Sequence, residues 1–163
     1  MRRRKPDPAA LAAPDDPRAA RLAALKILNR RDHGARELAN RLIARGFTRP
    51  AAEAAVEDLR RERLLDDARF AGHFVAYHAN RGRGPVGIAH RLREAGVPSD
   101  TIAAAVDAGS ADWRRRCAEV RRKRFGAKPP ASWAEKGRQA RFLTQRGFSA
   151  DQVRAAVGDE HEE

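Results

Sequence analysis

The chain of 163 residues is poor in the residues that build sheets, disulfides and membrane spans. Ser and Thr together number seven, and no run of Val, Ile and Thr is long enough for a strand. These shortages argue against β-sandwiches, barrels and α/β sheets. The single cysteine, Cys117, excludes an internal disulfide. No apolar run approaches the length of a membrane span, and none follows the basic start, so we expect a cytoplasmic protein without a signal peptide or membrane contact.

Ala, Leu, Arg and Glu are abundant instead, and all four are strong helix formers. Half of the hydrophobic residues are Ala, which predicts several small helical cores rather than one deep core. The formal net charge is +12, and residues 18–157 alone carry +15, because the last six residues contribute −4 and the first 17 contribute +1. A positive field of this size favours an anionic partner, such as nucleic acid, a nucleoprotein or an acidic protein face.

A spacing of four residues recurs three times along the chain. In each case Leu precedes Gly by four positions, an apolar residue follows Gly, and Val lies ten positions beyond Gly. The three motifs are Leu42, Gly46, Phe47; Leu92, Gly96, Val97; and Leu143, Gly147, Phe148. This pattern is typical of a helix that ends at a left-handed glycine, after which the apolar residue packs back on the Leu. We therefore expect a helix, a tight turn and a second helix in each repeat.

A longer amphipathic helix precedes each pair, which predicts an all-α fold of nine helices. They form three tandem three-helix repeats at 18–62, 66–107 and 110–157, stacked into an elongated, curved array. Residues 1–17, rich in proline, are expected to form a disordered tail, and 158–163 an acidic tail. We expect a monomer.

Two patterns that resemble catalytic or cofactor sites have simpler explanations. The segment 82–87 matches G-x-G-x-x-G, but a helix precedes it rather than a strand, so we interpret it as a flexible joint between helices. A helix N-terminus that accepts a phosphate is the alternative. Asp66 and Asp67 form a carboxylate pair, which we interpret as the cap and first turn of a helix. The five His residues and Cys117 do not have metal-ligand spacing. We therefore predict no enzyme activity, no cofactor and no metal site.

Arginine clusters on one predicted helix suggest a contact surface. Seven cations flank Cys117 and Val120, opposed only by Asp112 and Glu119: Arg114, Arg115, Arg116, Arg121, Arg122, Lys123 and Arg124. They form either a solvated helix face or a surface that attracts phosphates or an acidic protein. A helix-turn-helix that reads DNA, around Gly46 and Phe47, is an alternative, but its threefold recurrence favours structural repetition.

Taken in order, the motifs over about 140 residues resemble those of the RecX family. The stretches that carry the resemblance are LKILNRRDH (25–33) with REL (36–38), LLDDARFA (64–71), GRGP (82–85), RFL (141–143) and RGF (146–148). The resemblance implies a non-enzymatic regulator that lies along the RecA filament on DNA. Such a protein lowers RecA's ATP hydrolysis, strand exchange and co-protease activity.

Several charged residues stand within these motifs or in the cationic cluster and are candidate contacts with the filament or with DNA. From the motifs they are Arg30, Arg31, Glu37, Asp66 and Asp67, and from the cluster the seven cations at 114–116 and 121–124. A direct nucleic-acid-binding protein, acting as a repressor or binding weakly to single- or double-stranded DNA, is the alternative to a filament regulator.

Overall fold

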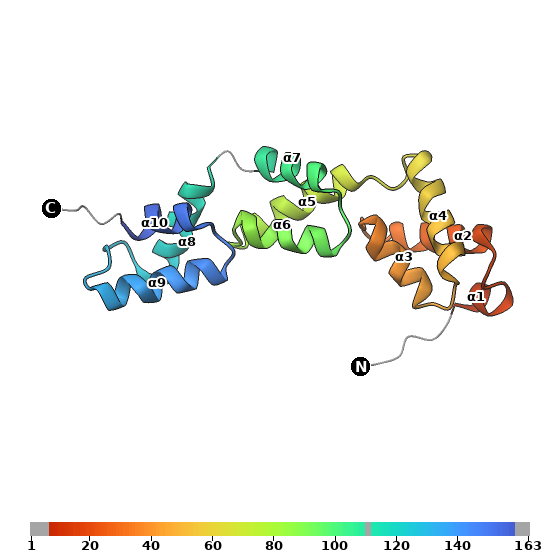
Figure 1. The fold of residues 1–163 in the computed structure, drawn as a ribbon, viewed down its shortest axis with the longest axis horizontal. Helices are drawn as coiled ribbons and strands as arrows, with labels where there is room; N and C mark the ends of the chain where they lie inside the picture. The colour runs from red at the N-terminus through yellow and green to blue at the C-terminus, as the bar shows by residue number, and fades with distance from the viewer. Residues whose placement is uncertain (1–6, 110–111, 159–163) are drawn as a thin grey trace. The chain divides into compact units, whose positions relative to one another are not determined.

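The computed structural model describes residues 7–109 and 112–158, and every regular element in them is a helix (Figure 1). The all-α prediction is therefore confirmed. The helices are α1 (Pro8–Ala12), α2 (Pro17–Leu28), α3 (Ala35–Ile43), α4 (Arg49–Arg61), α5 (Asp67–Asn80), α6 (Pro85–Glu94), α7 (Ser99–Gly109), α8 (Trp113–Phe125), α9 (Trp133–Gln145) and α10 (Ala150–Val157).

The prediction of a disordered start is wrong for residues 7–17. The Asp7 side chain accepts from the N–H of Ala9 and caps α1, while Asp16 accepts from Arg18 and caps α2. Both helices begin with proline, whose fixed φ suits the first helical turn. Ala10 of α1 is buried, and the N–H of Asp7 donates to the carbonyl oxygen of Arg45 over 3.0 Å. The proline-rich segment thus adds a tenth helix. Residues 1–6 and most of the predicted acidic tail, 159–163, lie outside the described residues.

The described chain divides into two compact units. One holds residues up to 71 together with 93–101, and the other holds 72–92 and 102 onward. In the first unit, α2 packs against both α3 and α4, and α1 packs on α2. Alanine at Ala20, Ala24 and Ala52 lets α2 and α4 approach closely, while Leu38, Leu42 and Leu59 fill the space beside them. Each such leucine contributes about 1.5–3 kcal/mol by its burial.

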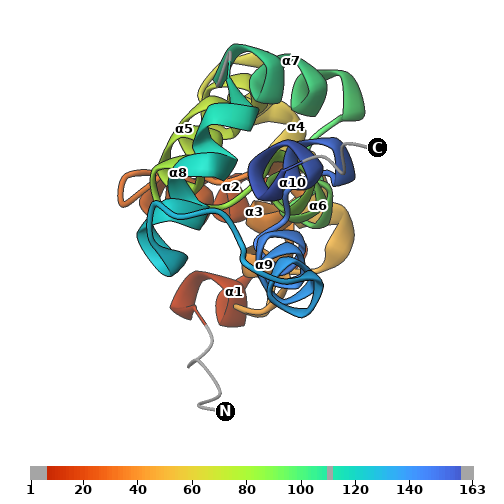
Figure 2. The ribbon, with the colours of Figure 1, turned by 90° about the vertical axis from the view of Figure 1, so that its left-hand side faces the viewer.

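In the second unit, α8, α9 and α10 pack on one another, as Figure 2 shows with these three helices facing the viewer. Their core contains Cys117 of α8, Leu143 of α9, and Val153 and Val157 of α10. Phe148, which follows the α9 turn, is also buried in this core. Burial raises the pKa of the Cys117 thiol to about 12, so it is a packing residue without thiolate character.

The turns after α3 and α9 have the geometry that the Leu-to-Gly spacing predicts. Gly46 and Gly147 have φ of 106° and 87°, and the same position in the middle repeat, Gly96, has 82°. The N–H of Phe47 donates to the carbonyl of Leu42 over 3.2 Å, and the N–H of Phe148 donates to Leu143 over 3.3 Å. These bonds satisfy carbonyls at the helix ends and bring the apolar residue back onto its leucine.

The glycine-rich segment before α6 is a hydrogen-bonded joint rather than a flexible one. The N–H of Gly84 donates to the carbonyl of Arg146 over 2.8 Å, and the N–H groups of Val86 and Gly87 donate to the carbonyl of Gly147. A Cβ at Gly84 would lie 2.4 Å from the backbone of Gly147, so no larger residue fits. The first N–H groups of α6 therefore bind the turn after α9, which leaves no place for a phosphate there.

Candidate nucleoprotein interface

Helix α8 carries the predicted cationic cluster, and its seven cations lie in different environments. Because successive residues on a helix are about 100° apart, Cys117 and Arg121 share the buried face. Arg116, Val120, Lys123 and Arg124 lie on a second face and line a pocket. Arg114, Arg115 and Arg122 lie outside that pocket and are exposed. The sequence cluster is thus three structural groups.

The prediction that Arg121 contacts the filament or DNA is wrong, because this residue is only 5% exposed. Its Nε–H donates to Oε1 of Gln139 over 2.8 Å, and a second guanidinium N–H donates to the carbonyl of Lys128. Gln139 is itself buried and donates to Glu135, whose other oxygen accepts from the N–H of Ala131. This network holds the loop between α8 and α9 against the helices, so Arg121 has a structural role.

Four of the other six cations of α8 are accessible to a partner. Within residues 7–109 and 112–158, no carboxylate pairs with Arg114, Arg122, Lys123 or Arg124, and all four side chains are exposed. Arg115 is the exception, since it lies 3.0 Å from Glu119 and 3.3 Å from Asp112. Unpaired exposed guanidinium and ammonium groups attract phosphates and acidic surfaces.

The motif residues of the first unit form an ion-pair network at the start of α3. Glu37 lies at its centre, with Nη2 of Arg31 at 2.7 Å and Nε of Arg41 at 3.2 Å. Buried His33 places Nδ1 3.1 Å from Glu37, without the alignment of a hydrogen bond. Arg30 is exposed in the turn after α2. Much of the charge at Arg31 and Glu37 is therefore used within the unit, and Arg30 is the more accessible of the candidates here.

Burial and the neighbouring charges shift two pKa values in this network. Burial holds the pKa of His33 below its ordinary 6.5, although Glu37 opposes the shift. Burial alone would raise the pKa of Glu37, but His33, Arg31 and Arg41 outweigh it and the pKa lies below its ordinary value of 4.5. At neutral pH the network therefore contains a neutral imidazole beside a carboxylate shared by two arginines.

Asp66 and Asp67 have the helix-terminal positions that the sequence predicts. Oδ1 of Asp66 accepts from the N–H of Arg69 over 2.9 Å, which caps α5. Asp67, with a side chain 12% exposed, accepts from the N–H of Ala35 at the start of α3 over 3.2 Å. Its other oxygen lies 2.6 Å from Arg60 at the end of α4. Asp67 therefore joins three helices, while Asp66 stays exposed.

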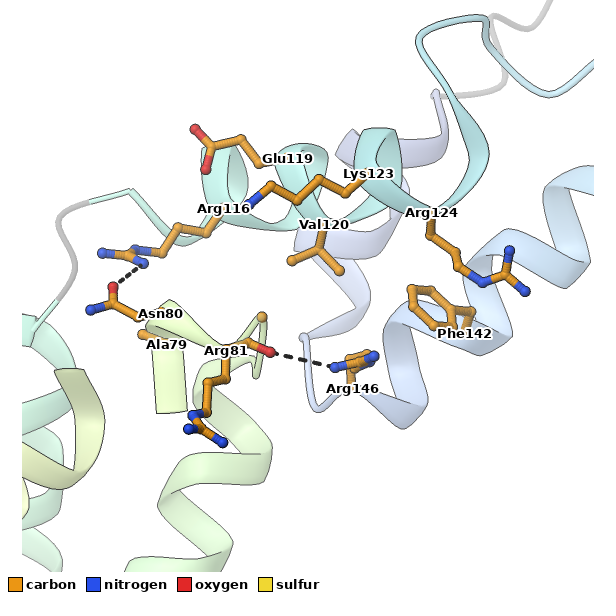
Figure 3. A pocket seen from close by; sticks show the side chains of 11 residues that line it. Ala79, Asn80, Arg81, Arg116, Glu119, Val120, Lys123, Arg124, Phe142 and Arg146 are labelled. Carbon is orange, nitrogen blue, oxygen red and sulfur yellow. Dashed lines mark hydrogen bonds between the residues drawn. The ribbon is translucent and has the colours of Figure 1, made fainter. Parts of the chain in front are cut away.

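A basic pocket of about 490 Å³ opens in the second unit between the end of α5 and helices α8 and α9 (Figure 3). Five cations line it: Arg81, Arg116, Lys123, Arg124 and Arg146. Its one carboxylate, Glu119, is paired with Arg115 outside the pocket. Positive charge therefore dominates the lining.

Two of these cations, Arg81 and Arg146, were missed in the sequence. Each stands immediately before a turn glycine, Gly82 and Gly147, at the end of a different helix. Figure 3 shows the Arg146 side chain between α8 and the end of α5, where it meets the carbonyl of Arg81, while the guanidinium of Arg81 is directed away from α8. A cation before a turn glycine is a usable signal only once the packing of the repeats is known, because Arg45 has the same position before Gly46 and lies in the first unit.

Clustered metal-ligating side chains or a long apolar helix would indicate another kind of site in residues 7–109 and 112–158. No group of three His, Cys, Asp or Glu side chains in that part of the chain could hold a metal ion. Among the helices of residues 7–109 and 112–158, none combines the length and apolar character needed to cross a membrane.

The chain matches three family models that together span most of its length. They describe the first, second and third three-helix domains of RecX and match residues 20–59, 66–106 and 114–157. The repeats detected in the sequence thus correspond to domains that the family models separate.

Curated relatives with the name "Regulatory protein RecX" match nearly the full chain. The protein from Halorhodospira halophila (strain DSM 244 / SL1) is 46% identical over 147 residues, which cover 89% of this chain and 91% of that protein. The protein from Stenotrophomonas maltophilia (strain R551-3) is 41% identical over 134 residues, 82% of each chain. The crystal structure of RecX from Lactobacillus salivarius has a TM-score of 0.72 at 18% identity, over 87% of this chain and 94% of that one, which shows a shared fold.

Proposed function

Because this chain belongs to the RecX family, we propose that it is a non-catalytic regulator that binds the RecA filament on DNA and inhibits RecA. Inhibition would lower ATP hydrolysis, strand exchange and co-protease activity together, since all three depend on the filament. The observation that carries the proposal is family membership over the whole array. Arg114, Arg122, Lys123 and Arg124 support it: they are exposed and pair with no carboxylate of the described residues, and a nucleoprotein filament presents phosphates and acidic protein surface.

The proposal is tested by titrating RecA's single-strand-DNA-dependent ATP hydrolysis with this protein at physiological salt, beside a binding assay on the naked DNA. Suppression well below the concentration that coats naked DNA is the expected result. Suppression only where the DNA is itself saturated would mean competition for DNA and would favour a direct nucleic-acid binder.

Charge reversal on α8 tests whether the exposed cations of this helix contact the filament. The variant Arg114→Glu/Arg122→Glu changes two exposed cations outside the basic pocket. A control, Arg18→Glu/Arg49→Glu, makes the same change in net charge on exposed residues of the first unit. We expect the α8 variant to weaken filament binding much more than the control. Equal weakening would assign the effect to the overall field rather than to this helix.

A further inference from the structure

Hydrogen bonds and a ring contact hold arginine side chains of the basic pocket in place. Nη1 of Arg116 donates to Oδ1 of Asn80 over 3.4 Å, and Nη1 of Arg146 donates to the carbonyl of Arg81 over 3.4 Å (Figure 3). The guanidinium of Arg146 also lies 5.2 Å from the ring centre of Phe142. Long side chains held in this way lose less entropy when a ligand binds.

The aromatic contacts extend this order to a third cation. The guanidinium of Arg81 lies 4.3 Å from the ring centre of Tyr77, one turn earlier in α5. A ring beneath a guanidinium fixes its plane while its N–H groups remain directed to the sides, where they can donate to an anion. Arg81, Arg116 and Arg146 thus line one hollow from the end of α5, from α8 and from the end of α9, with the guanidinium of Arg81 at its margin, directed away from α8 (Figure 3).

A second hollow continues the first. It has a volume of about 530 Å³ and shares Arg124 and Phe142 with the pocket. Arg138 and Arg141 of α9 add further cations, and Phe125 adds a ring that meets Phe142 edge to face at 5.3 Å between centres. Two adjoining hollows with cations throughout suit an extended polyanion better than one small anion.

We propose that these two hollows form one groove that binds the phosphates of a single nucleic-acid strand. The lining combines cations with two partly exposed rings, Phe125 and Phe142, which is the composition that single-strand sites use to hold the backbone and to pack bases or sugars. An acidic peptide would use the cations but has no need of the rings. Strand binding in the groove rests on the proposed function and extends it, because a RecA filament on DNA presents such a strand. The groove itself can bind a strand without RecA.

The test uses the full chain and a fluorescently labelled oligothymidylate, with binding measured by anisotropy over a range of salt. The groove variant is Arg116→Gln/Arg146→Gln, and the control, Arg91→Gln/Arg154→Gln, removes two exposed arginines of the same unit that do not line either hollow. We expect the groove variant to weaken binding about tenfold or more and to reduce the salt slope by about 1–2, while the control changes affinity less than about threefold.

Competitors distinguish the sources of phosphate. An abasic phosphodiester oligomer should displace the probe, and pyrophosphate should do so only weakly. Equal displacement by pyrophosphate would reduce the groove to a site for one small anion, and equal displacement by polyglutamate would make it a peptide site. An equal loss of affinity for the oligomer in the groove and control variants would overturn the proposal.

Folding and RecA regulation are measured in parallel. If Arg116→Gln/Arg146→Gln lowers the melting temperature, Lys123→Gln/Arg124→Gln replaces it, since neither of these two side chains forms an ion pair within the described residues. A groove variant that binds the oligomer normally refutes the groove, whatever RecA does. Normal oligomer binding by the wild-type chain without suppression of RecA refutes the proposed function and leaves the groove in place.

Discussion

The N–H of Gly84 and the carbonyl oxygen of Arg146 form a 2.8 Å hydrogen bond between residues 62 positions apart. This bond ties the start of α6 to the turn after α9. Glycine is needed in this segment because two backbones approach each other closely there. A nucleotide-binding motif would instead require a strand before the glycines. The joint also places Arg146 beside the end of α5, and so helps to form the basic pocket.

Gly84→Ala should destabilise the second unit by about 1–3 kcal/mol, because its Cβ would lie 2.4 Å from backbone atoms that cannot move independently. Gly137→Ala is the matched control: it lies within α9, and a Cβ there meets nothing within 4 Å. The control should be more stable than the wild type by about 0.5–1 kcal/mol, because Ala lowers the backbone entropy of the unfolded chain. Thermal unfolding of both variants decides the matter, and an unchanged midpoint for Gly84→Ala would contradict the joint.

Arg121→Met should cost about 1–3 kcal/mol, because the substitution leaves the buried Gln139 oxygen and the Lys128 carbonyl without their donor. Its neighbour Arg122 is exposed, and Arg122→Met should stay within about 0.5 kcal/mol of the wild type. Urea unfolding gives the free energy of unfolding of both variants. Similar values for the two variants would show that the interior network contributes little.

Asp67→Asn should lower stability modestly, by about 0.5–1.5 kcal/mol, because Asn keeps an acceptor for the N–H of Ala35 but loses the charge that pairs with Arg60. Asp67→Ala, which loses both interactions, should cost more. Suppression of RecA's ATP hydrolysis, measured well below the melting temperature, should persist in Asp67→Asn. Loss of suppression at an unchanged melting temperature would instead make Asp67 a contact residue.

His33 should make stability fall as the pH is lowered. Its pKa lies below 6.5 in the folded chain because of burial, so below about pH 7 the unfolded chain binds more protons than the folded chain does. The stabilisation is present above the unfolded pKa and is lost as the pH falls toward the folded pKa. The variant His33→Gln should show a smaller change in melting temperature between about pH 7.5 and 5.5. His78, whose pKa is also lowered by burial and by Arg91, Arg83 and Arg81, remains in both proteins and so serves as the internal reference.

Helix positions and the turns between them could be predicted because their causes are local. The Leu-to-Gly spacing gives turns with positive φ at Gly46 and Gly147, and the spacing of Ser149 and Gln152 gives the capping box observed at α10. Asp66 caps α5 for the same reason. The elongated, curved shape of the array and the repeat boundaries at 18–62, 66–107 and 110–157 stay predictions.

The parts that could not be predicted depend on contacts between distant segments. Nothing local distinguishes buried Arg121 from exposed Arg122, because the difference comes from Gln139 on the next helix. Arg81 and Arg146 meet only because Gly84 docks on the turn after α9. Proline near the N-terminus suggested disorder, whereas Pro8 and Pro17 start helices whose stability comes from packing.

The two-acceptor contact of Arg121 also bears on how this sequence can drift. Arginine codons are rich in G and C and lysine codons in A and T, so a genome that changes in base composition exchanges the two residues wherever either suffices. An ammonium group can replace the guanidinium at exposed Arg114, Arg122 and Arg124 with the charge retained. At position 121 one planar group must reach the Gln139 side chain and the Lys128 carbonyl at once. Among these arginines, we therefore expect mutational pressure to leave position 121 unchanged while it rewrites its exposed neighbours.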